Sequence, residues 1–362
     1  MSSSLTTADL FEKLKTKEKL LLLDIRESEE YESWTLPEAI NIPLNKLPFR
    51  ISFFASHQTV IVFCNHGNDS KQATKLLKQK RVNAFSLEGG LRLWNNVYDI
   101  TLVEPENPSP LKVYQVKRLG KGCLSYIIAD FNRKKAVLID PTRHDKIYLS
   151  FLKTNKLKLM TTLDTHIHAD HISGGKTIAK KKRVPYLSLL KLTPSKIESQ
   201  LNKIFKTKLF EVMEVPGHTP ESIAIKLGES FIFTGDTLFI ESVGRPDLVS
   251  DENTESNSRS LWQNIKEVIF RMNEDLFILP AHTKQQLLPS EPMISASLRY
   301  VKRANEIAEI GKVDDFVKKI LESKLPPPAN HQKIKEMNTS GKIKKIDLDE
   351  LEFGANRCAA EL

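Results

Sequence analysis

The chain is poor in the residues that build disulfide frameworks and membrane-spanning helices. Its 3 cysteines in 362 residues are too few for the cross-linked scaffold of a small secreted protein. No apolar run approaches the roughly 18 to 20 residues of a membrane helix, and the start, Met1–Asp9, lacks the apolar core of a signal peptide. We therefore expect a protein of the cytoplasm that binds no membrane and keeps its thiols reduced.

Length and charge narrow the classes of protein further. At 362 residues the chain exceeds one ordinary hydrophobic core, which predicts two domains. The formal net charge of +9 comes mostly from lysine, with the densest groups at residues 180–183 and 342–345. A solvated lysine-rich surface is the first interpretation, and attraction of an anionic substrate is the second. Nucleic acid is not an expected partner, because no RNA-binding segment or aromatic stacking motif accompanies the charge.

The clearest break in the chain is the proline-rich stretch Glu104–Pro110. Prolines at this density disfavour a helix and favour a semi-rigid linker. Before the stretch, strand and helix patterns alternate, as an α/β sheet requires. We predict an N-terminal domain over residues 1–104, a linker over 105–111 and a second domain over 112–362.

Periodicity predicts several elements of the second domain. Strands are expected over residues 123–129 and 136–140, and helices over 145–153, 258–272 and the charged region 293–323. The last fifteen residues carry no clear signal. Cys358, which lies among them, is interpreted as incidental.

Residues 165–171 read Thr-His-Ile-His-Ala-Asp-His and contain three of the nine histidines. His166 and His168 are two residues apart, so at the end of a strand they point to one side. Asp170 and His171 then follow in the turn. Imidazole and carboxylate ligands together suit zinc, iron or manganese, and few thiols lie nearby in the sequence for a sulfur site.

Three later segments repeat one local form, in which an apolar strand leads through a turn to a candidate ligand. They are residues 211–218, 230–236 and 276–282, which end at His218, Asp236 and His282. A strand that ends at a loop can hold a ligand rigidly while one coordination position stays open. The four segments together therefore predict a metal site.

The order HxHxDH, Pro-Gly-His218, Phe-Thr-Gly-Asp236-Thr and Pro-Ala-His282 resembles the metallo-β-lactamase fold superfamily over residues 112–340. The resemblance implies a sandwich of two β-sheets with helices outside (αβ/βα) and the metal at one edge. Residues 234–248 (Thr-Gly-Asp-Thr-Leu-Phe-Ile, then Val-Gly-Arg-Pro-Asp-Leu), the run Leu325-Pro-Pro-Pro-Ala329 and then Met337-Asn338 are similar to persulfide dioxygenases, and less so to glyoxalase II.

The resemblance leaves two metal contents open. In the persulfide dioxygenase pattern one Fe(II) per chain is held by His166, His218 and Asp236, and three positions stay free for water, substrate sulfur and O₂. The remaining candidates, His168, Asp170, His171 and His282, would then orient ligands and water. In the glyoxalase II pattern all seven residues would hold two zinc ions, with Asp236 bridging. The run Thr283-Lys-Gln-Gln departs from the expected loop and leaves the thiol contacts there open.

A cysteine in the first domain is the second candidate site. Cys64 follows the apolar strand pattern of residues 59–63, and a helical pattern begins near Lys71. A thiol at a helix N-terminus is expected to have a lowered pKa and to stabilise an anionic persulfide. A buried cysteine without a chemical role is an equally good interpretation of this feature alone.

Residues 5–100 resemble a rhodanese domain through the segments 20–27, 36–43 and 87–94, which read LLLLDIRE, LPEAINIP and LEGGLRLW. The resemblance implies that Cys64 carries sulfur. The active-site loop would continue through Asn65, His66, Gly67, Asn68, Asp69 and Ser70. Two departures stand out: Trp34-Thr-Leu-Pro-Glu38 replaces the usual Gly-His-Ile-Pro-Gly, and Asp69 stands where arginine is common. A carboxylate there opposes thiosulfate more than it opposes a persulfide.

Three hypotheses of function follow. The first is Fe(II)-dependent oxidation of a glutathione-type persulfide by O₂ to sulfite and thiol, with transfer of sulfane sulfur through Cys64. The second is a zinc-dependent thioester hydrolase of the glyoxalase II type, in which a metal-bound hydroxide attacks a carbonyl. The third is a sulfur carrier without enzyme activity, which fits the intact ligand set poorly. The sequence leaves open whether the chain forms a homo-oligomer.

Overall fold

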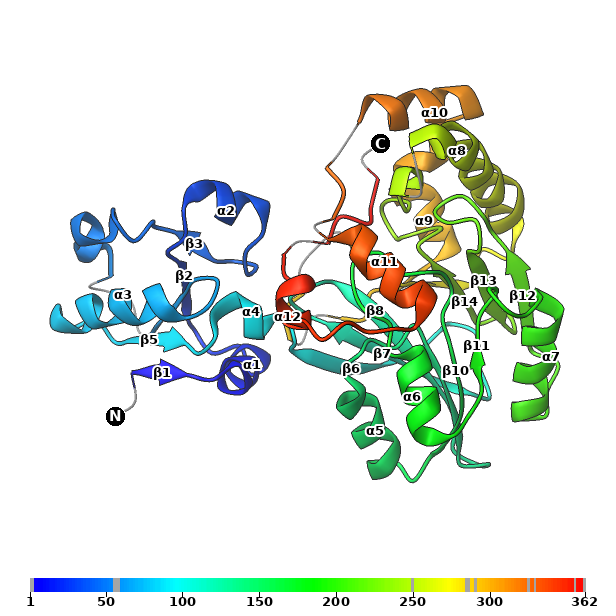
Figure 1. Cartoon of the computed structure of the whole chain (residues 1–362), viewed down its shortest axis with the longest axis horizontal. Helices are drawn as coiled ribbons and strands as arrows, with labels where there is room; N and C mark the ends of the chain where they lie inside the picture. The colour runs from blue at the N-terminus through cyan, green and yellow to red at the C-terminus, as the bar shows by residue number, and fades with distance from the viewer. Residues whose placement is uncertain are drawn as a thin grey trace.

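The chain folds into two lobes with three β-sheets (Figure 1). The computed structural model describes residues 3–54, 59–248, 251–283, 287–289, 292–323, 326–328, 330–354 and 356–360. The smaller lobe, blue to cyan in Figure 1, contains the N-terminus. The larger lobe contains the other two sheets.

The N-terminal lobe is an α/β domain with a parallel sheet in the order β1-β5-β4-β2-β3. Its strands are β1 (Ser4–Leu5), β2 (Leu21–Asp24), β3 (Ile40–Asn41), β4 (Val60–Phe63) and β5 (Ala84–Leu87). Its helices are α1 (Thr7–Lys15), α2 (Ser28–Ser33), α3 (Asn68–Gln79) and α4 (Gly90–Trp94), together with a 3₁₀ segment at Leu47–Phe54. All four residues of β4 are buried, as expected for a central strand of a parallel sheet.

The larger lobe is built on two mixed sheets. The first has the order β11-β10-β9-β8-β7-β6, from β11 (Tyr186–Leu187), β10 (Lys158–Leu163), β9 (Lys135–Ile139), β8 (Cys123–Asp130), β7 (Lys112–Arg118) and β6 (Tyr98–Val103). The second runs β12 (Phe210–Glu214), β13 (Ile223–Leu227), β14 (Phe231–Gly235), β15 (Phe277–Pro280) and β16 (Ala296–Ser297). Apolar side chains of both sheets form one core, in which the rings of Tyr126 and Phe233 lie 5.0 Å apart.

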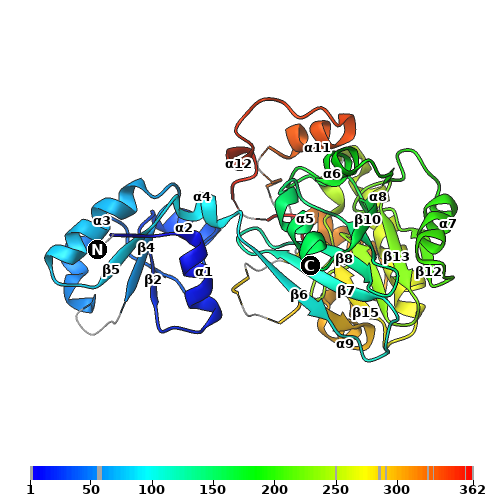
Figure 2. The ribbon, with the colours of Figure 1, turned by 90° about the horizontal axis from the view of Figure 1, so that it is seen from below.

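Helices cover this sandwich on the outside (Figures 1 and 2). They are α5 (Asp145–Thr154), α6 (Gly175–Lys182), α7 (Pro194–Phe205), α8 (Thr254–Gln263), α9 (Leu298–Ala304), α10 (Val313–Glu322) and α11 (His331–Ser340), whereas the short α12 (Leu348–Leu351) lies between the lobes. The expected αβ/βα sandwich is confirmed. No helix in the described part of the chain is both long and apolar enough to cross a membrane.

Most elements predicted for the second domain are present. β8, β9 and α5 match the strands and the helix expected at those positions. The helix expected over 258–272 begins earlier, at Thr254, and continues past Gln263 through a π turn and a 3₁₀ turn to Arg271. The region 293–323 is helical only in α9 and α10, because β16 adds to the edge of β15 and a 3₁₀ turn separates the helices.

The proline-rich stretch connects two neighbouring strands. β6 pairs antiparallel with β7 along its whole length, from Tyr98 opposite Arg118 to Val103 opposite Val113. Residues 98–103 therefore belong to the sheet of the larger lobe, and the prolines form the loop between β6 and β7. Proline lacks the backbone N–H donor, so a proline-rich stretch is compatible with a loop inside a domain as well as with a linker between domains. We propose a domain boundary near Val97 in place of the expected linker over 105–111.

The two lobes make specific contacts, and the C-terminal segment supplies several of them. The indole N–H of Trp34 donates to the carbonyl of Gly120 at 3.0 Å, and its ring meets Phe353 edge-on at 5.1 Å. Arg92 in α4 pairs with Asp347, just before α12, at 2.5 Å. The first departure from the rhodanese motif, Trp34, thus has a structural role in docking the lobes.

Candidate metal centre and thiol loop

The seven predicted ligands meet at one edge of the sandwich. Each follows a strand of one of the two sheets, and none is more than 5% exposed. The seven are His166, His168, Asp170, His171, His218, Asp236 and His282. Glycines allow the segments to approach closely. A Cβ at Gly235 would lie 2.7 Å from the Thr165 hydroxyl, and one at Gly244 would lie 3.0 Å from His218 Nδ1.

Three of these residues form a group with unpaired nitrogens. Donor atoms of His166, His218 and Asp236 all lie within 4.8 Å of one another. The Nε2 atoms of His166 and His218 are 3.6 and 3.5 Å from Asp236 Oδ2, and neither nitrogen has a hydrogen-bond partner among the described residues. Buried polar atoms are rarely left unpaired, so a metal ion would satisfy both nitrogens.

The protonation of this group suits a metal. Burial lowers the pKa of both His166 and His218, so their imidazoles are neutral at neutral pH. His218 Nδ1–H donates to the carbonyl of Arg245 at 2.8 Å, which leaves the Nε2 lone pair directed at the site. Although burial opposes ionisation of Asp236, the charge of His282 leads the effects that lower its pKa, and the carboxylate stays charged.

A second group is largely paired by hydrogen bonds, and among the described residues only its His171 Nε2 lacks a partner. His282 lies between two carboxylates, with Nδ1 2.6 Å from Asp236 Oδ1 and Nε2 3.1 Å from Asp170 Oδ2. His171 Nδ1 lies 2.9 Å from Asp170 Oδ1. Burial alone would lower the pKa of both imidazoles, but Asp170 raises that of His171 to about 10 and, with Asp236, raises that of His282 well above its usual value. Two imidazolium groups therefore neutralise the carboxylates.

Two cysteines at the second group were missed by the sequence analysis. Cys123 Sγ lies 3.2 Å from Asp170 Oδ2 and 3.7 Å from His171 Nδ1, and Cys358 shares a 4.8 Å group with Asp236 and His282. Few cysteines are near these ligands in the sequence, but the fold brings two thiols to them, and one belongs to Cys358, which was interpreted as incidental. Both cysteines arrive by tertiary folding, through the bridge between Cys123 and His282 and the pairing of the C-terminus with Gly244, and no sequence spacing signals either.

His168 faces a third group, which it forms with two aspartates that the sequence analysis did not select. Its Nε2 lies 3.3 Å from Asp140 Oδ1, and Asp164 is close to both. Asn338 of α11, part of the predicted Met337-Asn338 marker, donates to the carbonyls of His168 and His171 at 2.8 Å each. In the other marker, Leu325-Pro-Pro-Pro-Ala329, the two end residues lie outside the described residues.

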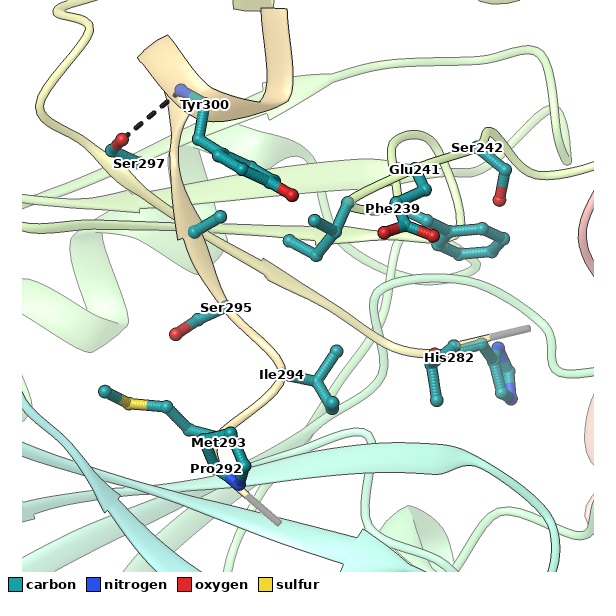
Figure 3. A pocket seen from close by; sticks show the side chains of 13 residues that line it. Phe239, Glu241, Ser242, His282, Pro292, Met293, Ile294, Ser295, Ser297 and Tyr300 are labelled. Atoms are coloured by element: carbon teal, nitrogen blue, oxygen red, sulfur yellow. Dashed lines mark hydrogen bonds between the residues drawn. The ribbon is translucent and has the colours of Figure 1, made fainter. Parts of the chain in front are cut away.

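A cavity of about 570 Å³ lies beside His282. Figure 3 shows Tyr300 and Phe239 across the space from Met293 and Ile294, with His282 at one end. The volume is within the range of small-molecule sites, and the lining is mainly apolar. Thr283 belongs to it, whereas Lys284, Gln285 and Gln286 of the departing run lie outside the described residues.

The second candidate, Cys64, begins a loop between β4 and α3. Its sulfur accepts a hydrogen bond from the N–H of Gly67 at 3.2 Å and lies 3.8 Å from the Ser70 hydroxyl. Gly67 has φ of 84°, a conformation that glycine adopts without strain. Asp69 is exposed in the first turn of α3. The predicted geometry of a thiol at a helix N-terminus is present.

Other residues of the loop reach outward. Asn65 accepts from Arg26 at 3.0 Å and donates to Glu30 at 2.7 Å. His66 Nε2 lies 3.2 Å from a carboxylate oxygen of Glu350 in α12. Asn68 is exposed at the start of α3. The loop that carries Cys64 therefore contacts the larger lobe through His66.

Comparisons with known proteins agree with both lobes. Residues 7–97 match the rhodanese-like domain family, and residues 119–205 match the metallo-beta-lactamase superfamily. The chain belongs to the metallo-beta-lactamase superfamily, with persulfide dioxygenases among its homologues, and carries a rhodanese domain at its N-terminal end.

Individual relatives include two kinds of enzyme. The human mitochondrial persulfide dioxygenase ETHE1 is 30% identical over 180 residues, which cover 48% of this chain and 69% of that protein; the corresponding mouse protein is covered over 65% of its length. Hydroxyacylglutathione hydrolase 1 of Vibrio vulnificus is 33% identical over 40% of this chain and 56% of its own length. The crystal structure of ETHE1 from Myxococcus xanthus aligns with a TM-score of 0.52 and 23% identity over 63% of this chain and 97% of that structure, which shows a shared fold.

Proposed function

We propose that the chain is a persulfide dioxygenase that uses one Fe(II) and is joined to a sulfurtransferase domain. The observation that carries the proposal is the contrast between the two groups at the sandwich edge. His166 and His218 have unpaired Nε2 atoms beside the charged carboxylate of Asp236. In the second group both nitrogens of His282 are paired with carboxylates, and among the described residues only Nε2 of His171 lacks a partner. Two imidazoles and one carboxylate with open positions are the ligands of non-haem Fe(II) oxygenases.

The proposed reaction balances with water as a co-reactant. A thiol persulfide, O₂ and water give the thiol, sulfite and two protons, so four electrons pass from sulfur to O₂ and the S–S bond breaks. Iron held by the three residues would supply the redox chemistry. Asp170, His171 and His282 would fix the orientation of Asp236 through the hydrogen bond from His282. A glutathione-type persulfide is the expected substrate.

Cys64 is proposed to carry sulfane sulfur. Its thiolate would attack the terminal sulfur of a donor persulfide, form a Cys64 persulfide and release the donor as a thiol. The Gly67 N–H, which reaches the sulfur, and the N-terminus of α3 would stabilise the anionic form. This role requires a reduced thiol, and for that reason we propose the cytoplasm as its compartment.

A zinc-dependent thioester hydrolase is the second candidate. Cys123, Asp170, His171 and His282 place four donor atoms within 4.8 Å of one another, which is also the requirement for a second metal ion. The hydrogen bonds within that group would then be replaced by bonds to zinc. The Vibrio relative, named as a hydroxyacylglutathione hydrolase, is consistent with this alternative.

Metal analysis and oxygen uptake decide between the iron dioxygenase and the zinc hydrolase. Protein purified without oxygen should contain one iron per chain and consume one O₂ per sulfite formed from glutathione persulfide. His218→Ala should lose iron and oxygen uptake together, while His66→Ala, the same substitution outside the centre, should retain both. Two tightly held zinc ions in the active protein, with thioester hydrolysis and no need for iron, would replace the proposal with its alternative.

A further inference from the structure

The segment 347–354, which we call the strap, crosses the boundary between the lobes. It contains α12, which lies beside α4 of the N-terminal lobe (Figures 1 and 2). Toward that lobe, Asp347 meets Arg92 and Asp349 accepts from Asn96 Nδ2 at 2.9 Å. Toward the larger lobe the strap buries Leu351, which packs against Ile172, and Glu352, which is 1% exposed.

The Glu352 carboxylate has three partners in the larger lobe. Its Oε1 accepts from the N–H of Ile172 at 2.8 Å and from Arg143 Nε at 3.0 Å. Its Oε2 lies 2.9 Å from a guanidinium nitrogen of Arg118, whose side chain is fully buried. A buried carboxylate with this many charged partners is fixed in position, since each alternative position would leave a charge unpaired.

The backbone of Glu352 contacts the N-terminal lobe. Its carbonyl accepts from Asn95 Nδ2 at 3.3 Å and from Lys121 Nζ at 2.9 Å. Arg118 reinforces the link, because its Nε donates to the carbonyl of Asn95 at 2.7 Å. Glu352 therefore contacts residues at the lobe boundary through its main chain and the larger lobe through its side chain.

Ile172 directly follows His171, so Glu352 accepts a hydrogen bond from the loop that contains Asp170 and His171. From there hydrogen bonds continue from His171 to Asp170, from Asp170 to His282 and from His282 to Asp236. Asp236 is a member of the group with unpaired nitrogens. No other side-chain acceptor is found for the Ile172 N–H in the described part of the chain.

We propose that Glu352 is a positioning residue for the metal centre, which holds the Asp170–His171 loop in register with the docked N-terminal lobe. The inference rests on the proposed function only in requiring a metal at His166, His218 and Asp236. It holds equally for a dioxygenase and for a hydrolase. Loss of the hydrogen bond from the Ile172 N–H to Glu352 would allow the Asp170–His171 loop to shift. The hydrogen bonds that orient Asp236 would then be weakened.

Charge-balanced double variants isolate the bond to Ile172. Glu352→Gln with Arg118→Met removes both charges and keeps an acceptor oxygen, whereas Glu352→Leu with Arg118→Met removes both charges and the acceptor. Full-length protein would be loaded with Co²⁺, and its visible spectrum and its affinity in competition with a chelator would be measured. The Leu variant should bind Co²⁺ about 10- to 100-fold more weakly than the Gln variant, as for other partners of metal ligands, and its spectrum should be shifted.

Controls separate positioning from stability. Glu350→Gln, two residues earlier in the strap and in contact with His66 and Arg92, should keep the wild-type spectrum and affinity. Sulfur loading of Cys64 reports whether the N-terminal lobe is folded. Equal spectra and affinities in the two double variants would overturn the proposal. If either fails to fold, Glu352→Asp decides, because it keeps the charge but is one methylene shorter: an unshifted Co²⁺ spectrum there would also overturn it. Absence of dioxygenase activity in the wild type would affect the proposed function alone.

Discussion

His282 Nδ1 lies 2.6 Å from Oδ1 of Asp236, the carboxylate that both metal hypotheses require. The opposite nitrogen of the same ring faces Asp170. Although burial opposes it, Asp170 and Asp236 raise the pKa of His282 well above its usual value, which favours a protonated ring between the two carboxylates. A single metal held by His166, His218 and Asp236, as proposed, would leave these bonds intact, whereas a second metal ion would replace them.

His282→Ala tests this interpretation. With one metal held by His166, His218 and Asp236, the variant should keep a stoichiometry of one and bind the metal about 10- to 100-fold more weakly, because Asp236 loses the partner that orients it. If two zinc ions occupied the site, the wild type would bind two and the variant one. Metal titration followed by elemental analysis distinguishes these outcomes, with His66→Ala as the matched control.

Cys64→Ser tests the separation of the two sites. Wild-type protein incubated with a persulfide donor should gain the mass of about one sulfur atom at Cys64, which mass spectrometry of the intact chain detects. The variant should lose this adduct and retain oxygen consumption on free glutathione persulfide, because the metal ligands lie in the other lobe. Loss of oxygen consumption in the variant would mean that substrate reaches the metal only by way of Cys64.

Local motifs were the part of the site that could be predicted. His166, His218, Asp236 and His282 each follow an apolar strand, and a strand with its loop is visible in a short stretch of sequence. Cys123 and Cys358 were not predictable in this way, since the first starts an ordinary buried strand and the second lies in a C-terminal segment without periodicity. Their place at the centre depends on how distant segments pair.

The boundary between the lobes was predicted less well for a related reason. Trp34 was noticed as a departure from the rhodanese motif, but its partners Gly120 and Phe353 are remote in sequence. Residues 98–103 were placed in the N-terminal domain because the prolines after them indicated a linker, whereas β6 pairs with β7 of the larger lobe. Glu352 looks like any acidic residue of a charged tail until Arg118 and Ile172 are placed around it.

Asp69→Arg tests the choice of sulfur donor. Asp69 is exposed in the first turn of α3, near the Cys64 loop, and a carboxylate repels the thiosulfate dianion by roughly 1 kcal/mol per charge pair at about 4 Å in water. The wild type should therefore transfer sulfur weakly from thiosulfate and well from persulfides. The variant should raise the thiosulfate rate several-fold and the persulfide rate less, and added salt should shrink the difference because exposed charges are screened.

Asp69→Asn is the matched control for this change, since it removes the charge without reversing it and should give an intermediate thiosulfate rate. Steady-state rates with both donors for the three proteins are sufficient. Equal thiosulfate rates in all three would assign donor choice to the backbone of the loop.

His144 is expected to make stability depend on pH. Its Nδ1 lies 2.8 Å from the Tyr98 hydroxyl, beside Arg143 and Asp349. Burial first, and then the charges of Arg118 and Arg143, lower the pKa of His144 to about 4 from a usual value of 6.5. The folded protein therefore keeps this imidazole neutral at a pH where the unfolded chain already binds a proton.

The sign of the effect follows from this difference. The stabilisation is complete above the unfolded pKa near 6.5 and is lost as the pH falls toward 4, since the unfolded state then binds more protons. By pH 5 the loss should reach at most about 2 kcal/mol. His144→Gln cannot titrate, so its free energy of unfolding should fall less than that of the wild type between pH 7.5 and 5, with the other buried histidines common to both proteins. Urea unfolding at these two pH values measures the difference, and parallel losses in the two proteins would mean that His144 is protonated in the folded state as readily as in the unfolded chain.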